Sequence, residues 1–137
     1  MEHKGIFNGA DVYDDYAHHP DELAATIDSV RASMPGRRLV LAFQPHTYTR
    51  TKALFDDFVK QLRKADVLVL AEIYAARESN TVGVSSADLA EQIPGSIFCE
   101  TLPEVTTQLR SIVEEGDVVI TMGAGDIFRA GEALLEK

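Results

Sequence analysis

Residues 38–43 read RLVLAF, and every position after the initial arginine of this run is apolar. Comparable runs recur at residues 67–74 (VLVLAEIY), 96–99 (SIFC) and 117–123 (DVVITMG). Strands that are apolar without alternation suit a parallel sheet, because helices cover both faces of such a sheet. The four runs therefore predict the core strands of a mostly parallel sheet.

The segments between these runs carry apolar residues at helical spacing. In the first segment they follow one another at steps of four, three and four residues, and later segments repeat this spacing. Strands that alternate with such helices build βαβ units. We therefore expect an α/β fold with a doubly wound, Rossmann-like sheet and helices on both faces. The residues that carry the pattern are Leu23, Ile27, Val30, Met34, Leu54, Phe58, Leu62, Val105, Leu109, Ile112, Ile127 and Leu134.

One hairpin signal is present, at Asn8-Gly9. These residues separate Ile6-Phe7 from residues 10–15 (ADVYDD), and both tolerate the positive φ angles that a two-residue type I′ turn requires. We expect a hairpin at the N-terminal edge of the sheet. With 137 residues and no linker-like stretch, the chain is expected to form one domain over residues 1–137.

The composition argues against several classes of function. The formal net charge is −9 and adjacent basic residues occur only at Arg37-Arg38 and Arg63-Lys64, so we expect no nucleic-acid partner. Cys99 is the single cysteine, which excludes an internal disulfide and a cysteine-based zinc cluster. No apolar run approaches the roughly 20 residues of a membrane span, and the N-terminus lacks a signal-peptide core. We expect a cytoplasmic protein with no membrane partner.

Polar residues gather where the predicted strands end. They read DDYAHHP at residues 14–20, QPHTYTRT at 44–51, EIYAARE at 72–78 and GAGD at 123–126. The carboxyl ends of parallel strands meet at one edge of a sheet, and ligands of open α/β sheets bind there. The four clusters therefore predict a ligand site at this edge.

Asp14 and Asp15 are adjacent, so their side chains point to opposite faces if the strand continues through them. Asp15 is the better candidate for a ligand contact, because its carboxylate can accept hydrogen bonds from ribose hydroxyls. The alternative is that either aspartate solvates a strand end or caps the next helix.

His18 and His19 are also adjacent, which makes one metal site using both sterically awkward. A helix cap or a surface position is the simpler interpretation of either one. His46 strengthens the case for a site, because it lies in the equivalent loop one strand later. Arg50 follows in the same loop, and its guanidinium can form a two-pronged contact with a carboxylate or a phosphate.

Gly123-Ala124-Gly125 resembles half of a dinucleotide-binding fingerprint, but position 128 is Phe128 rather than the third glycine. We interpret it as a tight turn that lets the backbone approach a ligand, with Asp126 capping the following helix. Glu72 and Tyr74 are further possible ligand contacts, although a glutamate at a strand end is commonly just solvated. No phosphate-binding P-loop sequence occurs in the chain.

Together these stretches resemble the C-terminal domain of the Mur ligases, and the resemblance covers essentially the whole chain. The matching residues are 4–23 (KGIFNGADVYDDYAHHPDEL), 43–51 (FQPHTYTRT), 72–78 (EIYAARE) and 122–127 (MGAGDI). The branch that recycles a tripeptide shares the first motif but looks different at the second. Residues 43–51 therefore favour the branch that adds L-alanine.

The resemblance implies a three-domain ligase of peptidoglycan precursor synthesis. Its N-terminal domain would bind UDP-N-acetylmuramate, and its central domain would carry the P-loop and most of the Mg²⁺ site. ATP would phosphorylate the muramyl carboxylate to an acyl phosphate, which the amine of L-alanine would then attack. The present chain would close over these domains from the amino-acid side, and alone it would be inactive.

The resemblance also implies roles for individual residues. Asp15 would contact the ATP ribose, and Tyr16 would face the acyl phosphate and the incoming alanine. His18, His46 and Arg50 would bind substrate and act in catalysis, with Arg50 on the alanine carboxylate and a histidine on developing charge. No residue of this chain is expected to bind the metal. Some family members have arginine where this chain has Thr47, so Thr47 is left out of the predicted site.

Three other classes of function stay open from the residues alone. A receiver-type phospho-acceptor domain is also a βα unit with an acidic pair after its first strand. However, the last strand lacks the expected lysine and the third ends in Glu72 rather than aspartate. An Asp/His metallohydrolase or a plain nucleotide-binding module would also fit the clusters.

Overall fold

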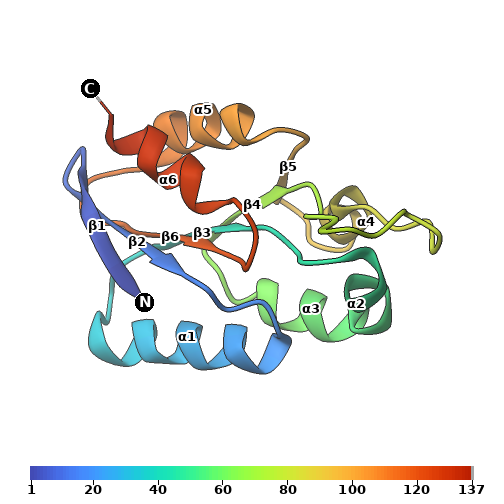
Figure 1. Cartoon of the computed structure of the whole chain (residues 1–137). Helices are drawn as coiled ribbons and strands as arrows, with labels where there is room; N and C mark the ends of the chain where they lie inside the picture. Colours follow the sequence, from blue (N-terminus) through green and yellow to red (C-terminus); the bar gives the residue numbers. More distant parts are fainter. Residues whose placement is uncertain (137) are drawn as a thin grey trace.

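The computed structural model describes residues 1–136, which form a six-stranded sheet between two layers of helices (Figure 1). Each neighbouring pair of strands is parallel except the first two, which are antiparallel. This arrangement confirms the predicted mostly parallel sheet. In their order across the sheet, the strands are β1 (Glu2–Phe7), β2 (Ala10–Asp15), β6 (Val118–Met122), β3 (Leu39–Phe43), β4 (Val67–Ala71) and β5 (Ile97–Cys99).

Helices cover both faces of this sheet, which confirms the doubly wound α/β fold. One layer contains α1 (Pro20–Ser33), α3 (Phe55–Leu62) and α4 (Ser86–Glu91), and the short helix α2 (Tyr48–Ala53) leads into α3. The opposite face is covered by α5 (Leu102–Ile112) and α6 (Phe128–Leu135), as Figure 1 shows.

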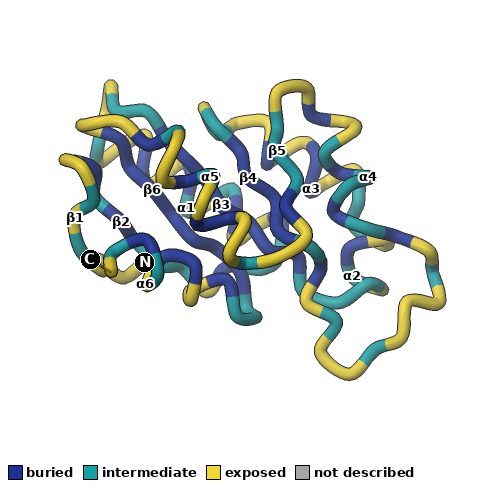
Figure 2. Tube along the Cα trace, turned by 90° about the horizontal axis from the view of Figure 1, so that it is seen from above, coloured by how far each residue is buried: buried dark blue, intermediate teal, exposed yellow. Residues whose placement is uncertain are grey.

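The core consists of two apolar layers that share the sheet. Leu39, Leu41 and Phe43 of β3 pack toward α1 and α3, while Val40 and Ala42 of the same strand pack toward α5 and α6. All five residues of β3 are fully buried. The central strands are buried along their length (Figure 2), which explains why their sequences are apolar without alternation.

The predicted N-terminal hairpin is present. Asn8 and Gly9 join β1 to β2, and both have positive φ angles, 48° and 81°. Two successive positive φ angles are the mark of a type I′ turn, whose twist matches that of the flanking strands. The hairpin places β2 next to the parallel core.

Two expected elements are shorter than their sequence patterns. The run at residues 67–74 is a strand only through Ala71, although the Glu72 amide still donates to the Cys99 carbonyl of β5 at 3.2 Å. The helical pattern at residues 54–62 corresponds to α3, which begins one residue later, at Phe55. The backbone of Leu54, with φ −110° and ψ 20°, is not helical and separates α2 from α3. The break gives α2 a direction of its own at the sheet edge. Within residues 1–136, no helix combines the length and apolar character needed to cross a membrane.

Candidate functional site

The four polar clusters all lie at the carboxyl edge of the sheet, as predicted. Since β6 lies between β2 and β3, the loops after β2 and β3 meet above the end of β6. The loop after β4 lies beside the loop after β3, and His46 and Tyr74 pair there as an isolated parallel β-bridge. Strand order therefore brings residues 14–20, 44–51, 72–78 and 123–126 together.

Four aromatic rings form a continuous row along this edge, which we call the aromatic row. Tyr16 and His18 lie 5.6 Å apart between ring centroids, and His18 and His46 lie 5.9 Å apart. His46 and Tyr74 are stacked at 5.6 Å. The structure thus brings together three residues of the predicted site, Tyr16, His18 and His46, from two different loops.

His46 and Arg50 each contain a buried polar atom that is unsatisfied within residues 1–136. The atoms are His46 Nδ1 and Arg50 Nη1, and neither has a hydrogen-bond partner there. Burial lowers the pKa of His46, and the charges of Arg50 and His18 lower it further, while Glu78 acts in the opposite direction. The imidazole is therefore neutral at pH 7. A buried donor without a partner is costly unless a ligand supplies one, so these atoms mark the centre of the candidate site.

His18 and His19 have different surroundings. His18 Nδ1 lies 3.1 Å from the Tyr16 carbonyl oxygen, and its ring belongs to the aromatic row. His19 is the N-cap of α1: its Nδ1 accepts a hydrogen bond from the Asp21 amide, while Glu22 accepts one from the His19 amide. The helix-cap interpretation is therefore correct for His19, and His18 alone faces the site.

The two aspartates at the end of β2 point to opposite faces, as the strand pattern requires. Asp14 accepts a hydrogen bond from Thr121 Oγ1 at 2.8 Å, and burial raises the pKa of its carboxyl. Asp15 accepts from the Ala17 amide at 2.8 Å and from Thr26 Oγ1 at 3.0 Å. The Asp15 carboxylate thus anchors the start of α1 from within the protein. Its role toward a ribose stays a prediction, for which free lone pairs remain.

Glu72 does not extend into solvent. Its two carboxylate oxygens accept hydrogen bonds from Ser85 Oγ at 2.7 Å and from the Ser86 amide at 3.0 Å. It therefore fixes the start of α4. These contacts give Glu72 a structural role at the start of α4, and its contact with a ligand stays a prediction.

The glycine turn lets other parts of the protein pack closely against its backbone, and its approach to a ligand stays a prediction. A Cβ atom on Gly123 would lie 2.7 Å from the Gln44 carbonyl oxygen, and one on Gly125 would lie 2.5 Å from Tyr74 Cγ. Only glycine leaves room for these neighbours. Tyr74 can thus pack over the turn and stack on His46.

Asp126 does not cap α6, contrary to the sequence-based expectation. Its carboxylate accepts a hydrogen bond from Gln44 Nε2 at 2.8 Å, and no side chain caps α6 through its N-cap, Ile127. Gln44 Oε1 instead accepts from the Ile127 amide at 3.1 Å. Sequence reasoning missed Gln44, which is 5% exposed and joins the loop after β3 to the loop after β6.

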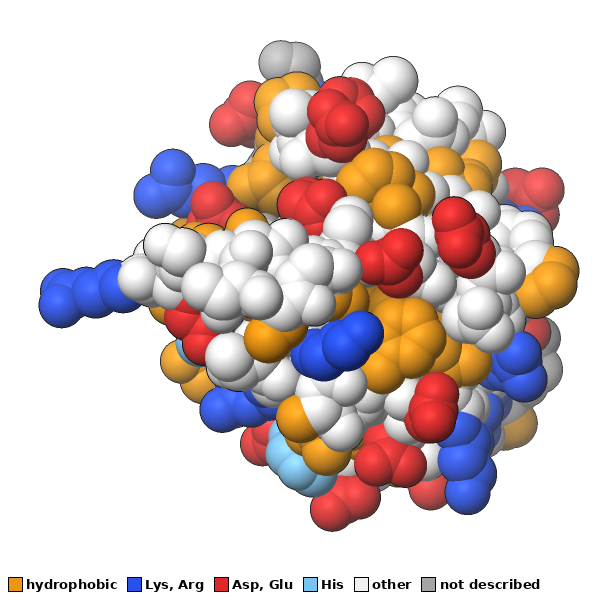
Figure 3. Space-filling view, turned by 90° about the vertical axis from the view of Figure 1, so that its right-hand side faces the viewer, with side chains coloured by type: hydrophobic (Ala, Val, Ile, Leu, Met, Phe, Trp, Pro, Cys, Tyr) orange, Lys and Arg blue, Asp and Glu red, His pale blue; other side chains and the backbone are white. Residues whose placement is uncertain are grey.

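A hollow of about 290 Å³ opens at the same edge, beside Tyr74 and the start of α5. Glu72, Glu100 and Asp126 are among the residues that line it, together with Tyr74. Figure 3 looks onto the side of the molecule where α2 and α4 lie and shows acidic side chains spread over it. Asp15, Tyr16, His18, His46 and Arg50 do not line this hollow, which meets the aromatic row only at Tyr74.

Comparison with known proteins identifies the family. The sequence model of the family described as "Mur ligase, glutamate ligase domain" matches residues 1–125. The chain therefore belongs to the Mur ligase family, in which it corresponds to this domain. The receiver-type alternative is not supported.

The curated relatives of the chain are named more narrowly. A UDP-N-acetylmuramate–L-alanine ligase from Lachnospira eligens is 50% identical over 140 residues, covering 99% of this chain and 30% of the relative. One from Aquifex aeolicus is 43% identical over 137 residues, covering 100% and 30%. The crystal structure of a UDP-N-acetylmuramate–alanine ligase from Thermotoga maritima has a TM-score of 0.72 at 29% identity and covers 93% of this chain and 26% of that chain. The chain thus spans about 30% of the length of the curated relatives it matches.

Proposed function

We propose that this chain is the amino-acid-side domain of an ATP-dependent ligase that joins L-alanine to UDP-N-acetylmuramate. The names of its curated relatives support this substrate pair. The N-terminal and central domains of the same ligase would be its partners, and its ligands ATP and a UDP-linked sugar suit the cytoplasm. The enzyme would supply an amide bond to a peptidoglycan precursor through an acyl phosphate.

The observation that carries this proposal is the pair of unsatisfied buried atoms, His46 Nδ1 and Arg50 Nη1. A guanidinium binds a carboxylate through two parallel hydrogen bonds, which fixes both distance and direction. Arg50 is therefore suited to hold the carboxylate of L-alanine. Orienting the substrate in this way can lower the barrier to attack by several kcal/mol, on the order of the effects seen in intramolecular reactions.

The neutral imidazole of His46 in the aromatic row suits the next step. When the alanine amine attacks the carbonyl carbon of the acyl phosphate, negative charge develops on the carbonyl oxygen, and phosphate then leaves. A hydrogen-bond donor aimed at that charge stabilises the transition state more than the ground state. His46 can donate from a ring nitrogen in its neutral form, and His18 lies next to it. Tyr16, 70% exposed, is open to contact with a substrate from the outer end of the row.

ATP and Mg²⁺ would be held mainly by the central domain. Within residues 1–136, no group of three or more His, Cys, Asp or Glu side chains lies together as metal ligands. The metallohydrolase alternative finds no support there either. Toward ATP, the chain offers the Asp15 carboxylate as a contact for the ribose, and it contains no P-loop.

The test is to rebuild the ligase from its parts. The 137-residue chain alone should release no phosphate with ATP, UDP-N-acetylmuramate and L-alanine, because phosphate activation needs the P-loop. Mixing it with the separately expressed N-terminal and central domains should restore release that depends on L-alanine. The Arg50→Ala chain, mixed in the same way, should restore little. Release by the chain alone, or equal restoration by Arg50→Ala, would contradict the proposal.

A further inference from the structure

Glu78 makes the polar contacts that organise the start of α2, the helix that carries Arg50. Its Oε1 atom accepts hydrogen bonds from the amides of Tyr48 at 2.7 Å and Thr49 at 3.2 Å. Its Oε2 atom accepts from Thr49 Oγ1 at 2.5 Å. These partners are about 30 residues away in sequence, so Glu78 ties the loop after β4 to the loop after β3.

The start of α2 needs such support. The helix has six residues, and its N-cap, Thr47, has φ 66°, a value that is unusual for a β-branched residue. The hydrogen bond from the Arg50 amide to Thr47 Oγ1 is long, at 3.4 Å. Thr51 Oγ1 adds a local hydrogen bond to the Thr47 carbonyl at 2.7 Å, but a helix this short depends on outside contacts for its position.

The loop after β4 supplies these outside contacts in two places. The Thr47 amide donates to the Tyr74 carbonyl at 2.8 Å, and the Tyr74 amide donates to the Pro45 carbonyl at 2.9 Å. Glu78 then holds the next turn through Tyr48 and Thr49. Residues 74–78 thus form a template along which residues 45–49 lie.

The carboxylate of Glu78 also limits which hydrogen-bond donors near the start of α2 remain free to bind an anion. Because it already occupies the first amides of α2, a substrate carboxylate is left with side-chain donors such as Arg50 and His46. Hydrogen bonds from Thr49 Oγ1 and from the Thr49 and Tyr48 amides lower the pKa of Glu78, so it is ionised at neutral pH. It is the acidic group whose charge acts on His46, beside the cationic influence of Arg50 and His18 and the stacked ring of Tyr74.

Resting on the proposed function, we propose that Glu78 is a positioning residue for the amino-acid substrate. By capping α2, it places the Arg50 guanidinium and the neighbouring His46 ring where they meet the carboxylate and the reacting centre. Glu78 itself touches no substrate in this arrangement. Loss of the cap should therefore weaken binding of L-alanine while binding of the UDP-sugar and ATP is unchanged.

The first measurement uses the complete ligase, the chain joined to its N-terminal and central domains. Glu78→Gln should raise KM for L-alanine roughly tenfold, because a misplaced guanidinium loses part of its two-pronged contact. KM for ATP and for UDP-N-acetylmuramate should stay unchanged. Glu91→Gln is the matched control, since it removes the same charge from an exposed position on α4 and should change none of the three constants.

The second measurement uses NMR on the 137-residue chain and does not depend on any activity. In Glu78→Gln, amide hydrogen exchange at Tyr48 and Thr49 should become faster, while exchange in the β1–β2 hairpin stays as in the parent chain. The pKa of His46 should fall further, because the acidic group that opposes its depression is gone. Unchanged exchange at Tyr48 and Thr49 would overturn the proposal.

The two measurements separate the possible failures. If exchange changes but KM for L-alanine does not, while Arg50→Lys does raise this KM, the positioning role is wrong and the proposed function stands. If neither variant changes KM, the proposed function fails as well. Should Glu78→Gln not fold, Thr49→Val removes one of its three hydrogen bonds and should raise the same KM by a smaller factor. An unchanged KM in that variant would overturn the positioning role.

Discussion

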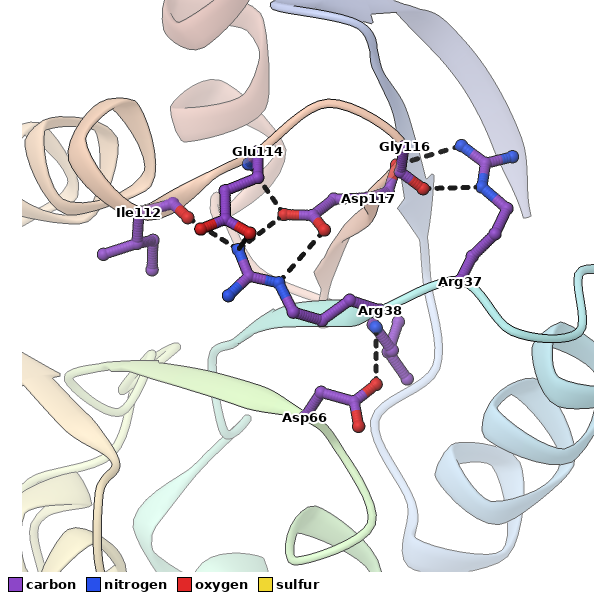
Figure 4. Close-up of polar contacts among 8 residues, drawn as sticks. Arg37, Arg38, Asp66, Ile112, Glu114, Gly116 and Asp117 are labelled. Atoms are coloured by element: carbon purple, nitrogen blue, oxygen red, sulfur yellow. Dashed lines mark hydrogen bonds and ion pairs between the residues drawn. The ribbon is translucent and has the colours of Figure 1, made fainter.

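The arginines at the two edges of the sheet differ in their hydrogen bonds within the protein. At the amino ends of the strands, Arg38 donates from Nε and Nη2 to both carboxylate oxygens of Asp117, at 3.0 and 2.7 Å (Figure 4). Its neighbour Arg37 donates to the Asp11 carboxylate and to the Gly116 carbonyl, both at 2.7 Å. At the carboxyl ends, the buried Nη1 atom of Arg50 has no hydrogen-bond partner within residues 1–136.

This difference separates stability from function. Arg38 satisfies Asp117, which is 3% exposed and whose burial would otherwise be costly. The hydrogen bonds to Asp117 raise the pKa of Arg38 above its already high value. The buried Nη1 atom of Arg50 instead has no hydrogen-bond partner within residues 1–136. A buried donor without a partner favours binding of a group that supplies an acceptor. The amino edge therefore stabilises the fold, whereas the carboxyl edge keeps the donors that we propose bind the substrate.

The largest effect should come from Arg50→Lys in the complete ligase. Lysine keeps the charge but loses the planar fork, so kcat/KM for L-alanine should fall roughly 100-fold. The free energy of unfolding should change by less than about 0.5 kcal/mol, because no partner within the described chain is lost. Steady-state kinetics and urea unfolding measure the two quantities. Arg31→Lys, at the opposite edge, should leave kcat/KM unchanged, and an equal fall there would erase the distinction between the edges.

Asp117→Asn should have the opposite profile. It leaves Arg38 with only the more distant Glu114 carboxylate, at 3.6 Å, and the free energy of unfolding should fall by about 2–3 kcal/mol, given that Arg38 is partly exposed. Urea unfolding of the 137-residue chain measures this loss. Asp28→Asn, on the exposed face of α1, is the control and should cost less than about 0.5 kcal/mol. A similar loss in both variants would show that the amino-edge network does not stabilise the fold.

Gly125→Ala should affect both stability and the site. The added Cβ atom would meet Tyr74 Cγ at 2.5 Å and Gln44 Oε1 at 2.6 Å, so the Tyr74 ring must move away from His46. We expect a loss of about 1–2 kcal/mol in the free energy of unfolding, typical of overpacking. A double-mutant cycle with Tyr74→Ala tests the cause, since the loss should shrink once the ring is removed. A loss that stays the same would place the conflict elsewhere.

The smallest effect should be the pH dependence that His46 adds to stability. Because the pKa of His46 is lowered from 6.5 in the folded chain, the unfolded chain binds more protons between the two values. Stability from this source is therefore complete above pH 6.5 and declines as pH falls toward the folded pKa. His46→Gln should reduce the difference in unfolding free energy between pH 8 and pH 5.5 by less than about 1 kcal/mol. An increase in that difference would mean that the folded protein favours the charged imidazole.

Local sequence predicted much of the fold because its signals act over a few residues. Apolar runs marked β3, β4, β5 and β6, and Asn8-Gly9 marked the hairpin. The break at Leu54 was missed, since an apolar period of 3.6 continues across it while the backbone does not. Local patterns report which residues are buried, but they do not report the direction that a short helix takes.

The sequence predicted which residues lie at the candidate site better than it predicted the hydrogen bonds that position them. His18, His46 and Arg50 were placed at one edge by the rule for parallel strands, and the structure shows His18 and His46 in ring contact. The catalytic and binding roles of these residues and of Asp15 and Tyr16 stay predictions. The cap that Glu78 makes on α2 was not predicted, because Glu78 and its partners are separated by about 30 residues.

The amino-acid sequence by itself determined the alternation of strands and helices, the hairpin and the edge at which chemistry gathers. The reason is that burial patterns and turn geometry depend on residues that are neighbours along the chain. Only the tertiary structure decided which polar groups find partners within the protein, as Glu72, Asp126 and Asp117 do, and which buried atoms lack one within residues 1–136, as His46 Nδ1 and Arg50 Nη1 do. A carboxylate or a guanidinium looks the same in sequence in either case, and its partner is selected by strand order and loop packing.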